Sequence, residues 1–430
     1  MKKITAAVMG FGDRGQIYAS YAKKAPEKLE IVACIDPDPV RLQKAKKMYG
    51  LREENCFADP AEFYAKDKLC DAVINATMDE LHVKTTLPLL EKGYDVLLEK
   101  PITSDEAELL QLQRAAQKSG RVLMICHVLR YAPFYVRIKH ILESGELGRV
   151  VNIFCSENVY IPHMLSSYVR GKWSSERGCG SGMLMAKCCH DLDMIVWLTG
   201  GMKAEEVSSF GARSVFCSAN KPKNAGTRCL VDCAAEPDCP YSARKLYLKN
   251  DCFPFLVWAN VPGKDWNEVG PAEREELLKT VNPHGTCAYE DKDLVDHQSV
   301  MVLFRGGVTA TLNMTGGTSR PGREIHIVCE RGEIEGFLES NSFVVRRYDA
   351  DLAACREERI DITEDTSGAH SGGDLRLAAD FVARVAGEKP SISCTSIDDS
   401  IAGHMLVIGA ERARREHTVI KFDSNGKFLV

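Results

Sequence analysis

The chain has 430 residues, of which 45% are hydrophobic, so it is long enough for two domains and for a sizeable core. Its net charge of −5 argues against a nucleic-acid partner, because such partners require concentrated Lys and Arg. No stretch approaches the roughly 20 apolar residues of a membrane span, so we expect no membrane partner.

The first predicted element is a strand over residues 4–9, which a glycine-rich loop follows at once. Gly10 permits a tight turn, Gly12 lets the backbone approach a pyrophosphate, and Gly15 lets the next helix pack on the strand. A G-x-G-x-x-G loop between a strand and a helix is typical of dinucleotide binding. The predicted cofactor contacts of this loop are Gly10, Gly12, Asp13, Arg14 and Gly15.

A second strand, over residues 31–35, ends in Asp36, about 20 residues beyond the glycine loop. A carboxylate there can accept hydrogen bonds from both ribose hydroxyls of the adenosine and repels a 2′-phosphate. This favours NAD over NADP as the cofactor, although Arg14 and Arg41 lie near enough in sequence to blur the preference. We place Asp36 and Arg41 at the adenosine end of the cofactor.

Strand and helix patterns alternate up to residue 126, which predicts a doubly wound parallel α/β sheet of the Rossmann type. The first domain is therefore expected to comprise residues 1–126. Its predicted helices cover residues 39–48, 59–65, 80–91 and 104–118, the last with Ser104 as N-cap, and its later strands cover residues 71–76, 95–101 and 121–126.

Residues 95–101 read Asp-Val-Leu-Leu-Glu-Lys-Pro, a short apolar run that ends in an acid, a base and a proline. Ligands of open α/β sheets bind beyond the carboxyl ends of the strands. Lys100 lies at such an end, so it is a candidate for chemistry. Taken alone, it could instead be a solvated charge that closes a strand.

From residue 150 onwards, β-rich runs are separated by glycine pairs, which predicts a meander in a second domain of residues 127–430. Strands are predicted over residues 150–155, 301–304, 308–314, 324–329 and 343–348, and helices over residues 133–142, 375–386 and 396–415. The last helices are expected to pack back on the first domain.

Residues 183–199 predict a helix with His190 and Asp193 near its start. A spacing of three puts both side chains on one face, so an imidazole and a carboxylate can point together. The alternative is a histidine beside an aspartate that caps the helix.

Four stretches together resemble the Gfo/Idh/MocA family, the glucose–fructose oxidoreductase and inositol dehydrogenase type. They are residues 10–15, 77–82 (Thr-Met-Asp-Glu-Leu-His), 99–101 (Glu-Lys-Pro) and 190–193 (His-Asp-Leu-Asp), and the resemblance covers nearly the whole chain. It implies further NAD contacts by Thr77, His82, Glu99 and Lys100. It also implies an α+β second domain with a large, mostly antiparallel sheet, whose exposed face would form a homo-oligomer contact.

The resemblance further implies that His190 lies beside a catalytic Lys100, with Glu99 orienting the lysine. The chain departs from the inositol dehydrogenase pattern at Ala186, where an aspartate is expected four residues before the histidine, and Lys187 is adjacent instead. The substrate hydroxyls that this chain holds are therefore expected to differ.

Seven side chains are candidate substrate contacts. They lie in four places: after the last strand of the first domain, in an aromatic loop, near His190, and in a glycine-rich loop. They are His127, Arg130, Tyr168, Trp173, Lys187, Asp193 and His370. Tyr168 can donate to a sugar and Trp173 can stack on one, with ordinary loop packing as an even alternative. His370 could instead be a solvated residue near a helix N-cap.

Seventeen cysteines in a chain with this much core indicate reduced thiols and a cytoplasmic protein. Cys229, Cys233 and Cys239 lie within eleven residues of sequence. A structural zinc would need a fourth ligand from Cys217 or Cys252. The spacing is not a C-x2-C pair, so unligated thiols are favoured over a metal site, and a disulfide is favoured least.

We therefore expect an NAD-dependent oxidoreductase that removes a hydride from a secondary hydroxyl of a sugar, polyol or glycoside, while Lys100 or His190 takes the proton. One alternative is an NAD-dependent glycosidase that transiently oxidises the third sugar carbon, eliminates the aglycone and re-reduces the sugar. Ala186, Lys187 and the loop around Tyr168 resemble that glycoside-active branch. The other alternative is a non-catalytic NAD-binding sensor, but such a protein would be expected to lack Lys100 or His190.

Overall fold

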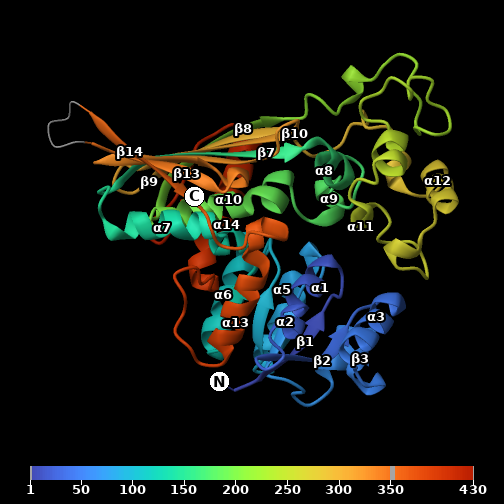
Figure 1. Ribbon diagram of the computed structural model, residues 1–430, viewed down its shortest axis with the longest axis horizontal. Coiled ribbons are helices and arrows are strands. Elements are labelled where there is room, and N and C mark those ends of the chain that lie inside the picture. Colours follow the sequence, from blue (N-terminus) through green and yellow to red (C-terminus); the bar gives the residue numbers. More distant parts are fainter. Residues whose placement is uncertain (1, 349–353, 430) are drawn as a thin grey trace.

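The computed structural model describes residues 2–348 and 354–429 and contains two separate sheets, each with its own helices (Figure 1). The first sheet is six-stranded and parallel, in the order β3-β2-β1-β4-β5-β6. Its strands are β1 (Ile4–Met9), β2 (Leu29–Ile35), β3 (Cys56–Phe57), β4 (Ala72–Asn75), β5 (Asp95–Leu98) and β6 (Leu123–Ile125). This order confirms the predicted Rossmann architecture. The direction of the strand order reverses between β1 and β4, and ligands of such sheets bind at this point.

The helices of the first domain follow the predicted order. They are α1 (Asp13–Ala19), α2 (Tyr21–Lys24), α3 (Pro39–Tyr49), α4 (Pro60–Tyr64), α5 (His82–Glu91) and α6 (Glu106–Ser119). The prediction that Ser104 caps α6 is wrong. Asp105 is the N-cap and accepts from the Glu108 N–H at 2.9 Å, while the Ser104 hydroxyl donates to the Gly180 carbonyl at 2.7 Å.

The second sheet has nine strands in the order β14-β13-β12-β11-β7-β10-β9-β8-β15. Its strands are β7 (Val150–Tyr160), β8 (Ala204–Ala212), β9 (His297–Phe304), β10 (Thr309–Thr318), β11 (Gly322–Cys329), β12 (Gly332–Phe337), β13 (Ser342–Tyr348), β14 (Cys355–Asp361) and β15 (Ile420–Lys421). It is mostly antiparallel, as the family resemblance implies. The simple meander is wrong, because β7 lies in the middle and pairs parallel with β10.

Three long helices cover one face of the nine-stranded sheet, namely α7 (Pro133–Ser144), α10 (Met183–Leu198) and α14 (Ile397–Glu416) (Figure 1). Helix α13 (Gly373–Val385) instead packs back on the first domain, where Leu377 and Phe381 share a core with Tyr18 of α1. His190 lies in the middle of α10 and not near its start, because the helix begins seven residues earlier, at Met183.

Residues 213–296 leave the sheet between β8 and β9, and we call this segment the excursion. It includes α11 (Pro254–Val257) and α12 (Pro271–Lys279) and lies at the right of Figure 1, beside the three short elements that follow β7: α8 (Ile161–His163), the π-helical turn η4 (Met164–Val169) and α9 (Glu176–Cys179). Phe216, Tyr247 and Trp258 are buried in it. The excursion therefore has packing of its own.

The cysteines of the excursion are free thiols. Across residues 2–348 and 354–429, no three His, Cys, Asp or Glu side chains are grouped so that they could hold a metal ion. The zinc site that the spacing of Cys229, Cys233 and Cys239 allowed is therefore not formed. No helix in the described part of the chain combines the length and the apolar character that a bilayer crossing requires.

Candidate active site

Lys100 follows β5 and lies at the carboxyl edge of the parallel sheet. The hydrogen bonds between β5 and β4 continue as far as Glu99, whose N–H donates to the Asn75 carbonyl at 2.8 Å. The Lys100 Nζ donates to the Ala186 carbonyl of α10 at 3.0 Å. His190 lies one helical turn further along α10, so the lysine and the histidine of the two domains come together at this edge.

Glu99 fixes the turn that carries Lys100. Its buried carboxylate accepts from the Arg14 Nε at 2.7 Å, the Tyr18 hydroxyl at 2.9 Å and the Lys100 N–H at 2.5 Å. Burial alone would raise the pKa of Glu99, but Arg14 and Lys100 outweigh it and the pKa is lowered. Glu99 is therefore a charged anchor and not a proton donor at neutral pH.

Arg14 also ties α13 to this site. Its Nη2 donates to Asp374 at 2.6 Å, and the Asp374 carboxylate lies 3.2 Å from the His370 Nδ1. Burial would raise the pKa of Asp374, yet His370 and Arg14 lower it to about 2. The returning helix thus delivers His370 to the same edge as Lys100.

Four imidazoles form a continuous line, which we call the histidine row: His404, His127, His190 and His370. Successive ring centroids are 5.2, 5.7 and 5.6 Å apart. Burial and then nearby cations lower the pKa of His127 and of His190 far below the usual value, so both rings are neutral. None of their four ring nitrogens has a hydrogen-bond partner among the described residues, so they are available to a bound hydroxyl or water.

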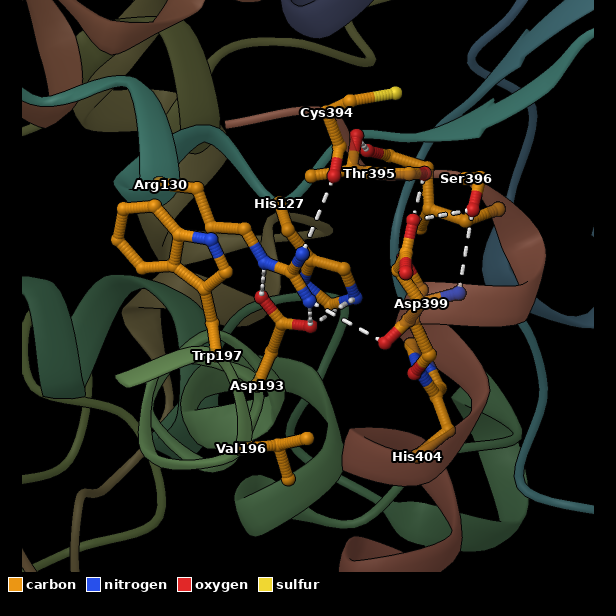
Figure 2. Close-up of polar contacts among 12 residues, drawn as sticks. His127, Arg130, Asp193, Val196, Trp197, Cys394, Thr395, Ser396, Asp399 and His404 are labelled. Carbon is orange, nitrogen blue, oxygen red and sulfur yellow. Dashed lines mark hydrogen bonds and ion pairs between the residues drawn. The ribbon is translucent and has the colours of Figure 1, made fainter. Parts of the chain in front are cut away.

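Arg130 and Asp193, two predicted substrate contacts, pair with each other instead (Figure 2). The Arg130 guanidinium donates to both Asp193 oxygens, at 2.7 and 2.5 Å, and to the Cys394 and Asp399 carbonyls. Both side chains are buried. They join α10 to the first turn of α14 and to the segment before it, so their role as substrate contacts stays a prediction that this pairing does not favour.

Lys187 belongs to a buried chain of alternating charges. Its Nζ lies 3.1 Å from Glu157 of β7, and Arg323 of β11 pairs with Glu157 at 2.7 Å and with Asp191 at 2.7 Å. Sequence reasoning missed Glu157 and Arg323 as part of the site. The available signal was a Ser-Glu pair inside an otherwise β-rich run, since a carboxylate on a covered strand requires a partner.

The aromatic loop after β7 reaches the first domain. The Trp173 Nε1 donates to Asp79 at 3.1 Å, and the same carboxylate accepts from the Ser181 hydroxyl at 2.9 Å. The Lys172 ammonium lies 4.0 Å from the centre of the Trp173 ring. Tyr168 is buried beside Trp173, and burial holds its pKa far above the usual value, so the phenol stays neutral and can donate.

The glycine loop has the shape that a dinucleotide requires. Gly10 has a φ of +86°, and a Cβ there would lie 2.4 Å from the Ala76 carbonyl oxygen. A Cβ on Gly15 would lie 2.0 Å from the Gly10 oxygen, so α1 packs tightly on the loop. At Gly12 only an Arg41 nitrogen comes within 4 Å of that position, which leaves room for a pyrophosphate.

The acidic residue after β2 is buried behind this loop. The Asp36 carboxylate accepts from the Phe11 N–H at 2.7 Å and the Asp38 N–H at 2.9 Å. Burial raises the pKa of Asp36. The Arg41 Nη1 lies 3.9 Å from the same carboxylate, so a cation borders the adenosine end, as the sequence suggested. Asp13 is exposed in the first turn of α1.

Thr77 and His82 connect the ends of two neighbouring strands. The Thr77 hydroxyl donates to Asn75 at 2.9 Å. The two His82 ring nitrogens lie 2.6 Å from the Pro101 carbonyl and 3.1 Å from the Thr77 carbonyl. His82 therefore braces the loops that follow β4 and β5, next to the predicted cofactor cleft.

The comparisons with known proteins agree with this geometry. Residues 4–127 match the oxidoreductase family with an NAD-binding Rossmann fold, and residues 135–222 match the GFO/IDH/MocA C-terminal domain. YteT of Bacillus subtilis is 24% identical over 364 residues, which is 82% of each chain. Inositol 2-dehydrogenase 4 of Saccharopolyspora erythraea is 27% identical over 223 residues, 51% of this chain and 60% of that protein.

Among solved structures, an oxidoreductase from Agrobacterium radiobacter in complex with NAD+, L-tartaric acid and magnesium has the same fold. Its TM-score is 0.68 at 14% identity, over 98% of each chain. The cofactor of this protein is NAD, as the glycine loop and Asp36 predicted. The chain belongs to the Gfo/Idh/MocA family of NAD-binding oxidoreductases.

Proposed function

We propose that the protein oxidises a secondary hydroxyl of a sugar, polyol or glycoside. The observation that carries this proposal is the contact between Lys100 and α10, which gathers an ammonium and the neutral His190 at the sheet edge where the dinucleotide loop opens. A secondary alcohol bound there would meet groups able to move its proton next to the cofactor cleft.

When bound, NAD would accept the hydride from the carbinol carbon. The residues of the chain manage the proton and the orientation. An unpartnered nitrogen of His190 can accept a hydrogen bond from the reacting hydroxyl, and Lys100 can take or supply the proton. Glu99, held by Arg14 and Tyr18, keeps the lysine on its turn.

The surroundings suit a substrate with several hydroxyls. Lys187, Tyr168 and His370 approach the site from three different elements and offer both charged and neutral polar groups. The inositol 2-dehydrogenase relative acts on a polyol by its name, which agrees with this class. We assign these three side chains to substrate hydroxyls.

A second candidate is a redox-neutral glycosidase. In this reaction the third sugar carbon is oxidised transiently, the neighbouring C–H becomes acidic, the aglycone leaves, water adds and the carbon is reduced again. The excursion favours it: Asn260 and Asp265 contact Arg41 at 3.2 Å and Lys44 at 2.6 Å, beside the adenosine end of the cleft. A covered cofactor suits a reaction that returns the hydride in each cycle.

The test is incubation of the purified protein, loaded with NAD, with a panel of polyols and glycosides. NADH absorbance, ketosugar and released aglycone are followed together. Net NADH with a ketosugar supports the dehydrogenase, and free aglycone without net NADH supports the glycosidase. If neither product forms with any member of the panel, the proposal of a sugar-active enzyme fails.

A further inference from the structure

Five aromatic rings form a connected path from the cofactor cleft to the excursion, and we call this path the aromatic row. It runs from Trp173 to Tyr168, His163, Phe253 and Phe255. Successive ring centroids are 6.3, 5.9, 5.1 and 6.0 Å apart. The catalytic first domain contributes none of the five; the loop after β7 contributes three and the excursion contributes two.

The inner end of the aromatic row reaches the first domain, where the Trp173 Nε1 donates to Asp79 at 3.1 Å. Burial and then the charges of Lys187 and Lys100 lower the pKa of His163. Tyr168, the next ring, is buried near Asp79 and Glu157. A ligand that extends from this edge along the row would therefore meet Trp173 and Tyr168 before His163.

Phe253, near the outer end of the aromatic row, has an unfavourable backbone conformation. Phe253 has a φ of +51°, a left-handed conformation that a bulky residue rarely adopts. In this conformation its ring stacks on His163 with an interplanar angle of 22°. Such outliers persist where the surroundings hold them, and they gather at ligand sites.

Phe253 and Phe255 are both partly exposed, at the start of α11 where the excursion approaches the other domain (Figure 1). These side chains present only carbon surfaces. Such surfaces match a flat aromatic group better than a second sugar, whose hydroxyls would need hydrogen-bond partners.

We propose that the aromatic row is an aglycone subsite, and that the substrate is a glycoside of a planar aromatic alcohol. The sugar would lie against Lys100, His190 and Lys187, while the aromatic group would lie along His163, Phe253 and Phe255. This inference deepens the proposed function, because it rests on a glycoside being the substrate.

The subsite is tested without turnover, on the NAD-loaded protein, with two matched probes. Benzyl alcohol is aromatic and cyclohexylmethanol is its saturated equivalent, and neither carries a secondary hydroxyl. Ligand-observed NMR titrations measure both affinities. We expect benzyl alcohol to bind about three- to tenfold more tightly, which is the usual contribution of an aromatic pair.

Phe253→Gly is the informative variant, because glycine adopts a positive φ without strain and the fold should be kept. We expect it to reduce the benzyl alcohol preference to near one, with an unchanged circular dichroism melting curve. Phe253→Tyr retains the ring and should retain the preference. Phe255→Leu tests the outer ring independently.

Equal binding of the two probes, no binding of either, or an unchanged preference in Phe253→Gly would overturn the subsite. These outcomes are separate from a failure of the proposed function, which is measured by product formation with the panel of polyols and glycosides. Preferential binding of benzyl alcohol by a protein without sugar turnover would disprove the proposed function and, with it, the assignment of the aglycone, and would leave only a site for aromatic groups.

Discussion

Lys100 is held by a backbone carbonyl of α10, whereas the inositol dehydrogenase pattern has an aspartate at that position of the helix. A carbonyl accepts a hydrogen bond without bringing a full negative charge. The charged groups near Lys100 are instead Glu99, which is on the same turn, and the ion pair between Lys187 of α10 and Glu157 of β7.

Replacement of Lys100 by methionine keeps the length of the side chain and removes its proton. We expect kcat to fall about 10²–10⁴-fold, the usual contribution of a positioned acid or base, and NAD affinity to fall much less, because Lys100 is only one of several predicted NAD contacts. Steady-state kinetics and fluorescence titration with NAD measure the two effects. Lys187→Met is the matched control and should mainly raise KM. Full activity in the Lys100 variant would contradict the proposed role.

The Rossmann fold and the NAD cofactor were predictable from the strand pattern and the glycine loop, because each depends on a local pattern; the role of Lys100 and the individual NAD contacts stay predictions. The pairing of Arg130 with Asp193 could not be predicted, for a physical reason. A sequence shows that charges are present, but not that two of them neutralise each other in the interior. Glu157, Arg323 and Asp374 were missed because their partners lie on other elements.

Removal of Arg130 tests this structural assignment. Arg130→Met leaves Asp193 as a buried charge without its main partner, and breaking such a pair costs about 3–5 kcal/mol. Chemical denaturation followed by circular dichroism measures the free energy of unfolding. Arg412→Met, at an exposed pair on α14, is the control and should leave the unfolding midpoint unchanged. Loss of activity without loss of stability would instead indicate contact with substrate.

At the scale of elements, the excursion is the part that the sequence described least. The spacing of its cysteines allowed a metal site, although unligated thiols were favoured, and said nothing of the buried aromatic side chains and the contacts with α3 that hold it. Strand β14 also escaped prediction, since its Cys-Arg-Glu-Glu-Arg-Ile-Asp run lies on an exposed edge and has no buried face to give an alternating pattern. Helix α13 was predicted as a helix and packs on the first domain, as expected.

The contact between the excursion and α3 should affect how long the cofactor stays bound. Lys44→Ala or Asp265→Ala removes a partly buried ion pair, which is worth up to about 1 kcal/mol. We expect NAD to leave up to about fivefold faster in stopped-flow displacement experiments. The exchanged pair, Lys44→Asp with Asp265→Lys, should restore slow release. Unchanged release in both single variants would show that the excursion does not retain the cofactor.

At the scale of the whole molecule, the nine-stranded sheet has one face covered by helices and one left open. Phe210 of β8 and Met301 of β9 are 72% and 59% exposed, and their register pairs, Phe210–Ser299 and Ser208–Met301, are two positions apart, which puts both side chains on the same face. Large exposed apolar groups that lie together mark interaction surfaces. We propose that this face forms a homo-oligomer contact.

Charges placed on this face should separate the subunits. We expect Phe210→Glu combined with Met301→Glu to shift the mass measured by light scattering to that of one chain. Val281→Glu changes a residue of the excursion that is 77% exposed, and the oligomer should persist. If the wild-type protein is already a single chain at micromolar concentration, the proposed contact is wrong.

Buried neutral histidines give the whole fold a dependence on pH. Burial lowers the pKa of His404 to about 3 and that of His284 to about 4, whereas an unfolded histidine titrates near 6.5. As the pH falls from 6.5 to 4, the unfolded chain takes up protons that the folded chain does not, so the free energy of unfolding decreases. Each such histidine contributes a slope of about 1.4 kcal/mol per pH unit in this window.

Denaturation curves between pH 4 and 8 measure this slope, and His284→Gln identifies one contributor to it. The His284 Nε2 lies 3.0 Å from the Ser166 carbonyl, and a glutamine amide can donate there without titrating. The free energy of unfolding of the variant should therefore decrease less than that of the wild type as the pH falls. At pH 8 we expect the variant to have the lower free energy of unfolding of the two. The same change at His140, which is exposed on α7, is the control. Identical slopes in the wild type and in the His284 variant would mean that the buried imidazole already binds its proton in the folded protein.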